Sequence, residues 1–278
     1  MSSADGIRIA AFRELWVHTG TACNLSCEFC HEAAAPADTR LTPPTFDELA
    51  PQLDAAAAAG VERFAFTGGE PLIHRDIVRI LRHALALRPV LVLTNGTAPL
   101  LRRPHSLAQL QGLAHAATFR VSIDHPDETL HDAARGYRNF RKALQGLKIL
   151  VDAGFDAGIT RLCLPGEDVA DMTQRFRLLL RRHGLPDTLP VVGLPDLGRP
   201  GRAAPARPAM ATGAETACCR SRLLFRRGST LAYGPCPLVD DDPGLDLGHS
   251  LREALAATVI PRHARCATCL ETGVNYAG

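Results

Sequence analysis

The chain has 278 residues, of which 46% are hydrophobic and 22% charged, and a formal net charge of +2. This composition is typical of a soluble globular protein with ample core. We expect neither a membrane nor a nucleic acid as a partner, because no stretch approaches roughly 20 apolar residues and the arginine-rich positive charge forms no polybasic tract. Residues 1–10 lack the segments of a signal peptide, so the nine cysteines predict reduced thiols in a cytoplasm, acting as metal ligands or catalytic groups.

Short apolar strands alternate with amphipathic helices from residue 13 to residue 192. The expected strands span residues 13–18, 63–66, 90–93, 118–123, 158–164 and 189–192. The expected helices span residues 46–60, 76–87, 106–114, 137–153 and 169–183. This alternation predicts an α/β fold built from βα units, a partial (β/α)6 TIM-like barrel. In such barrels the chemistry takes place at the carboxyl ends of the strands.

Three cysteines, Cys23, Cys27 and Cys30, follow the first expected strand in the spacing C-x3-C-x2-C. This spacing is too tight for a useful disulfide framework and suits a loop around one compact iron–sulfur cluster. Three thiolates leave one iron of a four-iron cluster open for a ligand. A zinc knuckle is the alternative, but zinc normally takes four ligands, and His31 is the nearby candidate for a fourth.

The cysteine spacing, with the aromatic Phe29 directly before the last cysteine, resembles the radical S-adenosylmethionine (SAM) enzymes. The resemblance implies a [4Fe–4S] cluster whose open iron binds the amino and carboxylate groups of SAM. It also implies that an electron, delivered by an external donor such as flavodoxin or ferredoxin, cleaves SAM to a 5′-deoxyadenosyl radical. A partial barrel is the known core of this family.

Further segments at the expected strand ends resemble SAM-binding motifs of the same family. Gly68, Gly69, Glu70 and Pro71 match a GGEP motif that holds the methionine amino group, although these residues could also form a plain turn. Asn95 lies in a segment that resembles the family's TNG motif.

The fourth expected strand ends with Ser122 and Asp124 on one face. The resemblance assigns both to the ribose or methionine of SAM, and Arg135 to its carboxylate. The alternative is that Asp124 caps a helix and Arg135 forms a surface ion pair. On the fifth strand, Arg161 and Cys163 share a face. Facing inward, Arg161 would need an anionic partner such as the SAM carboxylate, Asp124 or the substrate, whereas Cys163 could be a small buried hydrophobe.

The tail carries five more cysteines: Cys218, Cys219, Cys236, Cys266 and Cys269. One of Cys218 and Cys219, with the other three, supplies four thiolates, and structural zinc is an alternative occupant. A hairpin strand at 231–237 and a helix at 251–257 accompany them, and residues 194–202 resemble the family's P-x-x-GR linker. The layout resembles the Twitch form of the SPASM domain, which holds one auxiliary [4Fe–4S] cluster. We expect a barrel over residues 1–202 and this auxiliary domain over residues 203–278.

The resemblance implies an enzyme that abstracts hydrogen from a small polar metabolite, such as an aminocyclitol or aminosugar of specialised metabolism, to oxidise or epimerise it. A fully ligated auxiliary cluster would transfer electrons, while Cys219, Cys163 or Arg161 are candidates for catalytic roles. The second reading is maturation of a ribosomally made precursor peptide by thioether, carbon–carbon or epimer formation. A non-catalytic iron–sulfur or zinc protein is a third, disfavoured because the cysteine and GGEP motifs are intact.

Overall fold

The structure is a computed structural model that describes residues 6–163, 166–198 and 216–272. Eight strands form one sheet in the order β6-β5-β4-β3-β2-β1-β7-β8. The strands are β1 (Glu14–His18), β2 (Arg63–Thr67), β3 (Val90–Thr94), β4 (Ala117–Ser122), β5 (Asp156–Leu162), β6 (Val191–Leu194), β7 (Ser221–Arg227) and β8 (Thr230–Gly234). All neighbours from β6 to β7 pair in parallel, and β7 pairs with β8 antiparallel.

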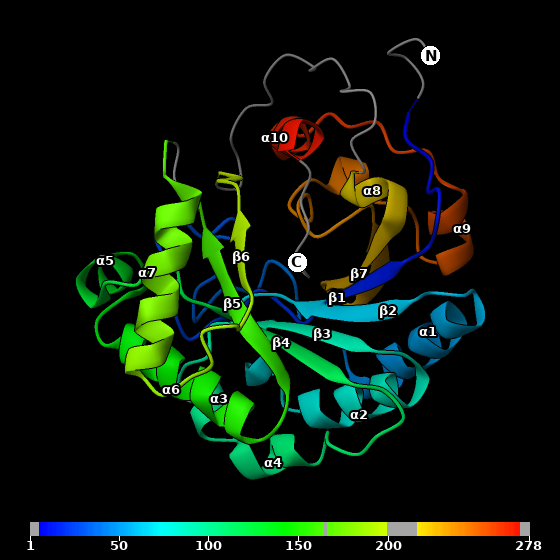
Figure 1. The fold of residues 1–278 in the computed structure, drawn as a ribbon. Coiled ribbons are helices and arrows are strands. Elements are labelled where there is room, and N and C mark those ends of the chain that lie inside the picture. Colours follow the sequence, from blue (N-terminus) through cyan, green and yellow to red (C-terminus); the bar gives the residue numbers. More distant parts are fainter. Residues whose placement is uncertain (1–5, 164–165, 199–215, 273–278) are drawn as a thin grey trace.

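Helices connect the parallel strands, as the βα pattern predicts (Figure 1). Between β1 and β6 they are α1 (Phe46–Ala58), α2 (Ile77–Leu87), α3 (Ala98–Leu101), α4 (Pro104–Ala108), α5 (Glu128–Arg135), α6 (Asn139–Asp152) and α7 (Val169–Arg182), with the short 3₁₀ turn η1 (Pro71–Ile73). Helix α8 (Ala217–Arg220) precedes β7, and the 3₁₀ turn η2 (Pro243–Leu245), α9 (Leu251–Ala256) and α10 (Ala264–Thr272) follow β8. The predicted α/β fold with a parallel sheet is confirmed. The sheet is not closed, because β6 and β8 are its two edges.

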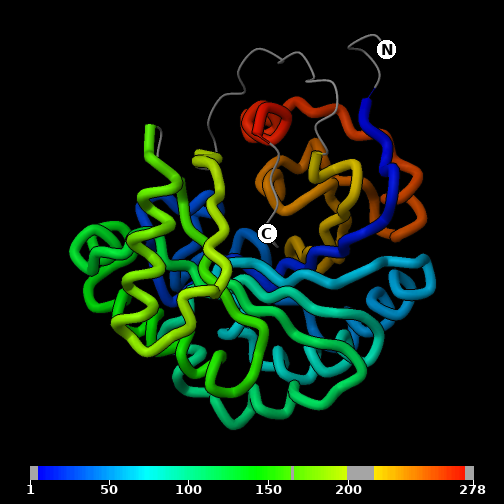
Figure 2. The backbone as a smooth tube through the Cα atoms, viewed as in Figure 1, coloured from blue at the N-terminus to red at the C-terminus, as the bar shows by residue number. Residues whose placement is uncertain are grey.

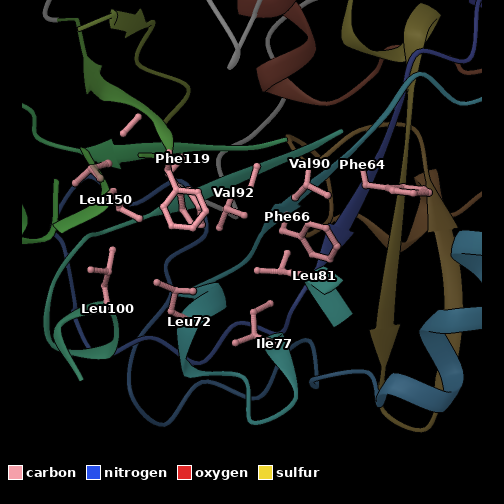
Figure 3. Close-up of a cluster of buried hydrophobic side chains, with 14 of the residues drawn as sticks. Phe64, Phe66, Leu72, Ile77, Leu81, Val90, Val92, Leu100, Phe119 and Leu150 are labelled. Carbon is pink, nitrogen blue, oxygen red and sulfur yellow. The ribbon is translucent and has the colours of Figure 1, made fainter. Parts of the chain in front are cut away.

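The main core lies between the outer face of the sheet and the helices. Helix α2 buries Ile77, Ile80, Leu81, Ala84 and Leu85, the one-sided stripe expected of an amphipathic helix. Figure 3 shows part of this core, with phenylalanines of the strands facing leucines and isoleucines of the helical layer. Burying each such side chain contributes about 1.5–3 kcal/mol, so this layer holds the strand ends in fixed positions.

The opposite face of the sheet is covered by the tail. Trp16, Ala65 and Leu91 belong to a second apolar cluster that includes Leu238 and Cys269 from the C-terminal segment. Strand β7 pairs in parallel with β1, so the hairpin predicted near residue 231 continues the barrel sheet. Ile7 pairs with Val259, and Figure 2 shows the N-terminal segment running beside the C-terminal one. The predicted boundary at residues 202 and 203, and residues 199–202 of the 194–202 linker, lie outside the described residues.

Two segments differ from the sequence-based expectation. The helix expected over residues 106–114 is wrong in extent, because α4 begins at Pro104, which suits a first helical position, and ends at Ala108. Gly112 then has a left-handed φ of 69°, which ends any continuation of the helix. Helix α5 was not expected, although the Asp127 side chain caps it by accepting from the amides of Thr129 and Leu130.

No helix in the described ranges is long and apolar enough to cross a membrane.

Candidate active site and metal centres

The cysteine loop follows β1 and lines a cavity at one end of the sheet. Cys23, Cys27 and Cys30 border one cavity of about 1010 Å³, part of it open to solvent. The carboxyl ends of five parallel strands also line this cavity, through Thr67, Thr94, Ser122, Leu162 and Leu194 among others. The site therefore lies where the barrel rule predicts it.

The three thiols are chemically suited to a metal centre. They are free cysteines. Burial raises the pKa of Cys23 to about 12, and burial also raises the pKa values of Cys27 and Cys30. Neighbouring thiolates repel one another, so these thiols stay protonated unless a cation compensates them. This donor set, three thiols that line one open cavity, fits a [4Fe–4S] cluster with one iron left for a ligand.

The GGEP turn packs directly against the cysteine loop. The Gly69 amide donates to the Gly20 carbonyl at 2.9 Å, and the Glu70 amide donates to the Ala22 carbonyl at 3.2 Å. A Cβ atom on Gly69 would lie 2.3 Å from the Ala22 carbonyl oxygen and 2.5 Å from that of Thr21. Gly68 and Gly69 both line the cavity. The close backbone approach predicted toward a ligand is thus also an approach to the loop that carries the cysteines.

Glu70 lies beneath this turn and is 2% exposed. Its carboxylate accepts from the Leu72 amide at 2.9 Å, the Thr94 hydroxyl at 2.8 Å and the Asn95 amide at 2.7 Å. Burial raises its pKa, and these three donors oppose that effect. Glu70 and the buried Pro71 are not among the residues that line the cavity. Glu70 therefore fixes the ends of β2 and β3 relative to each other.

Replacing Glu70 by glutamine is expected to lower the free energy of unfolding by about 1–3 kcal/mol, because an amide NH2 must face one of the three donors. Anaerobic urea unfolding of wild type and variant measures the difference. Glu62→Gln, at an exposed position, is the control and should stay within about 0.5 kcal/mol. An equal stability of Glu70→Gln and Glu62→Gln would contradict the role given to Glu70.

Asn95 joins the end of β3 to the cysteine loop. Its side-chain amide donates to the Asn24 side-chain oxygen at 2.9 Å, and the Asn24 amide donates to the Thr97 hydroxyl at 2.9 Å. Asn95 also lines the cavity. The TNG segment therefore does more than border the cavity, because it holds the first residue after Cys23 in place.

Ser122, Asp124 and Arg135, which the resemblance assigns to SAM, line the same cavity, and so does Phe29 of the cysteine loop. Asp124 and Arg135 form an ion pair, with Nη2 of Arg135 3.3 Å from Oδ1 of Asp124. Both side chains are largely buried, so this is not the surface ion pair of the alternative interpretation. Asp124 is not a helix cap either, because α5 is capped by Asp127. The guanidinium of Arg135 also lies 5.2 Å from the ring of Phe29.

His131 lies next to Asp124 and is 1% exposed. Its Nδ1 accepts from the Asp124 amide at 3.3 Å. Burial, reinforced by the charge of Arg135, lowers its pKa from 6.5 to about 4. Since the unfolded chain takes up a proton near pH 6.5 and the folded chain does so only near pH 4, stability falls as the pH falls through this window.

Because of His131, we expect the free energy of unfolding to fall by about 2 kcal/mol when the pH is lowered from 7 to 5. Anaerobic urea unfolding at both pH values checks this. His131→Asn keeps an acceptor for the Asp124 amide but does not titrate, so its loss of stability over the same interval should be smaller by that amount. An unchanged pH dependence in His131→Asn would refute the assignment.

Arg161 lines the cavity and is 2% exposed, but its anionic partner was missed from the sequence. Nη1 of Arg161 lies 2.9 Å from Oε2 of Glu167, in the loop before α7. Cys163 is not among the lining residues, and its sulfur packs near Gly193 of β6. Arg161 thus stays a candidate beside the cavity, whereas Cys163 faces the neighbouring strand.

Four tail cysteines line a second, smaller cavity: Cys218, Cys236, Cys266 and Cys269. Burial raises the pKa of Cys218 and of Cys266 to about 11. Burial, with the nearby thiols of Cys218, Cys266 and Cys269, raises that of Cys236 well above its usual range. Cys219 is not among the lining residues, and its thiol donates to the Thr216 carbonyl at 2.9 Å. Of the adjacent pair, Cys218 is therefore the residue that faces the cavity shared with the other three cysteines.

Polar contacts join the two cysteine groups, which are the three cysteines of the loop after β1 and the four tail cysteines of the second cavity. The sequence gives no signal for these contacts. Arg265, 1% exposed and directly before Cys266, donates to the carbonyl of His31, directly after Cys30, at 2.7 Å. Arg265 also donates to the Leu238 carbonyl at 2.8 Å and lies 3.1 Å from Oδ1 of Asp241. Arg265 and His31 are 234 residues apart in the sequence, so periodicity and spacing cannot reveal the contact.

A second set of polar contacts also joins the cysteine loop to the C-terminal segment. Arg40 donates to Glu32 at 3.1 Å and to Asp240 at 2.7 Å, and His18 lies 3.1 Å from Glu32. His18, Glu32 and Asp240 have a donor set that could hold a metal ion. The guanidinium of Arg40 pairs with both carboxylates, and Glu32 also pairs with His18, so a structural ion-pair network is the better description.

Comparison with known proteins points to one family. The model of the "Radical SAM superfamily" matches residues 17–179. A probable GTP 3′,8-cyclase of Methanocella arvoryzae is 34% identical over 158 residues, which cover 56% of this chain and 47% of the relative. A GTP 3′,8-cyclase of Yersinia pestis is 32% identical over 137 residues, which cover 48% and 40%. The chain thus matches about half the length of such curated relatives.

Solved structures share the fold at low identity. SuiB of Streptococcus suis bound to SAM has a TM-score of 0.63 and 14% identity, and the match covers 86% of this chain and 64% of SuiB. The AdoMet-bound protein anSMEcpe has a TM-score of 0.64 and 13% identity, covering 88% and 77%. These matches support the α/β barrel architecture.

The expected reaction was wrong. The sequence predicted oxidation or epimerisation of an aminocyclitol or aminosugar, with maturation of a ribosomally made peptide as the alternative. The curated relatives are instead named GTP 3′,8-cyclases, which act on GTP. The error arose because the motifs that identify the family bind SAM and its cluster, while the residues that select the substrate carry no motif.

Proposed function

This chain belongs to the radical SAM superfamily, and we propose that it cleaves SAM reductively and directs the resulting radical to a purine ribonucleotide such as GTP. The observation that carries the proposal is the meeting, around one cavity, of three thiols, the GGEP glycines and the buried Asp124–Arg135 pair. When bound, the cluster and SAM supply a 5′-deoxyadenosyl radical that abstracts a hydrogen atom from the substrate.

The residues of the chain would bind and orient these groups. Cys23, Cys27 and Cys30 would hold the cluster, and the backbone of Gly68 and Gly69 would accept the ammonium group of SAM at the cavity wall. Arg135 is held at the cavity by Asp124, where its remaining donors can meet a carboxylate. The half-buried Ser122 offers a hydroxyl on the same wall.

The tail would hold a second metal centre. We assign its ligands to Cys218, Cys236, Cys266 and Cys269, which share one cavity. A [4Fe–4S] cluster is the proposed occupant, and four thiols also satisfy zinc. With four protein ligands, an iron–sulfur cluster here would have no open iron, so electron transfer is the role that it could serve. A zinc ion, which is redox-inactive, would be structural.

The nucleotide substrate is proposed from the curated relatives, which this chain matches over about half their length. The cavity offers a cationic side chain beyond the SAM-binding wall, Arg161, whose ion pair with Glu167 leaves further N–H donors for a phosphate. His31 lines the same cavity.

The test uses anaerobically reconstituted protein, dithionite and SAM, with GTP whose ribose carbons carry deuterium. We expect 5′-deoxyadenosine to form, to contain deuterium, and to form faster with GTP than with CTP or without nucleotide. Absence of 5′-deoxyadenosine under all conditions would overturn SAM cleavage. Formation of 5′-deoxyadenosine without deuterium, at a rate independent of GTP, would overturn the nucleotide substrate and leave SAM cleavage standing.

A further inference from the structure

A basic groove lies on the outer side of the cysteine loop. It consists of two adjacent hollows that share Arg103, one bordered by α2 and α4 and the other by the cysteine loop, η1, α3 and α6. Its cationic side chains are Arg75, Arg79, Arg82, Arg102, Arg103 and Lys142. The protein as a whole has a net charge of only +2, so this concentration of positive charge is local.

Little of this charge is neutralised within the protein. Asp76 is the single carboxylate among the described residues that line the groove, and it pairs with Arg75 at 3.2 Å. Arg79 lies 3.6 Å from Asp47. Within the described ranges, Arg102 and Arg103 have no carboxylate within ion-pair distance, so their field is directed at solvent or at a partner.

Two exposed apolar side chains lie within the groove. Tyr137 is 83% exposed and Ile73 is 37% exposed, and both border the same hollow as Arg102 and Lys142. Exposed apolar side chains surrounded by charged ones are the composition of a protein–protein contact surface. A groove that bound only small anions would gain nothing from exposing them.

The groove is separated from the catalytic cavity by one loop. Leu25 lines both the groove and the cavity. Its amide lies 3.4 Å from the sulfur of Cys23, a proposed cluster ligand. Asn24, which borders the groove, is held by Asn95 and Thr97. A partner seated here would therefore come close to the cluster site without entering the cavity.

We propose that this basic groove is the docking surface for a small acidic one-electron carrier protein that reduces the cluster site. The inference rests on the proposed function, because reductive SAM cleavage consumes one electron per turnover. In this step the reduced carrier would lose one electron to a cluster held by Cys23, Cys27 and Cys30, and no bond would be formed or broken. Acidic side chains of the carrier pair with Arg102, Arg103 and Lys142, while Tyr137 and Ile73 supply the apolar centre.

The test is the double variant Arg102→Glu/Arg103→Glu in the reconstituted full chain, with flavodoxin as the probe. The matched control is Arg177→Glu/Arg182→Glu, which makes the same charge change at exposed positions of α7. Calorimetry measures the Kd for flavodoxin, and SAM cleavage is followed with flavodoxin hydroquinone and, separately, with dithionite.

We expect the double variant to bind flavodoxin at least about tenfold more weakly than wild type, the loss of two charge pairs at about 0.7 kcal/mol each. Its dithionite-driven cleavage should stay within twofold of wild type, and the control should match wild type in both assays. Equal Kd values for the double variant and the control would overturn the proposal. The proposal would also be overturned if wild type bound neither flavodoxin nor ferredoxin. Binding of a single-stranded oligonucleotide at the same residues, tighter than that of flavodoxin, would overturn it as well.

The two proposals fail separately. Lack of dithionite-driven SAM cleavage in wild type would remove the proposed function, whereas the calorimetric Kd still decides whether the groove binds the carrier. Normal dithionite activity with unaltered carrier binding in the double variant would remove the docking surface alone.

Discussion

Replacing Gly69 by alanine is expected to lower the rate of SAM cleavage by at least about 100-fold. The added Cβ would lie 2.3 Å and 2.5 Å from two carbonyl oxygens of the cysteine loop, well inside the ordinary contact distance. Both obstacles are backbone atoms, so either the GGEP turn or the loop must shift. A displacement of about 1 Å at a catalytic group can cost about 100-fold in rate.

The matched control is Gly60→Ala. Gly60 follows α1 with a φ of +87°, and a Cβ there would meet nothing within 4 Å. That variant should lose about 1 kcal/mol of stability through backbone strain and keep its SAM cleavage rate. Rates of 5′-deoxyadenosine formation, corrected for iron content, decide the matter. A Gly69→Ala rate within threefold of wild type would show that the cysteine loop does not depend on this contact.

Replacing Arg265 by methionine is expected to lower the free energy of unfolding by about 3–5 kcal/mol. Methionine retains the apolar stem but leaves the carbonyls of His31 and Leu238 without their buried donor. The Asp241 carboxylate keeps His263 and loses Arg265. Because Arg265 connects the cysteine loop with the start of α10, both proposed metal centres should lose occupancy.

Anaerobic urea unfolding and iron content measure this effect. Arg252→Met, at an exposed position of α9, is the control and should differ from wild type by less than about 0.5 kcal/mol. Arg265→Lys should recover part of the loss, since an ammonium group can donate to one or two of the three partners. Wild-type stability and iron content in Arg265→Met would exclude Arg265 as a link between the two cysteine groups.

Much of the barrel could be predicted because its signals are local. Each parallel strand is a short apolar run, and α2 shows its buried stripe in the spacing of Ile77, Ile80, Leu81, Ala84 and Leu85. The motifs at the strand ends meet at one cavity for the same reason, since parallel strands place their carboxyl ends together.

The rest depends on contacts between distant parts of the chain. The pairing of β7 with β1 brings residue 221 beside residue 14, and no period or spacing in the sequence specifies that register. The choice between Cys218 and Cys219 depends on which thiol faces the second cavity. Glu167 as the partner of Arg161 follows from the path of a loop. The substrate was predicted wrongly because its recognition has no fixed motif.

The most direct test of the two-centre account is an iron and sulfide count on anaerobically reconstituted protein. Wild type is compared with the triple variant Cys23→Ala/Cys27→Ala/Cys30→Ala and with Cys218→Ala/Cys236→Ala. We expect about eight irons per chain in wild type and about four in each variant, with SAM cleavage lost in the triple variant. About four irons in wild type that disappear in the triple variant, with zinc retained by the tail, would contradict the second cluster. Iron retained in full by the triple variant would contradict the assignment of Cys23, Cys27 and Cys30, and with it the central claim.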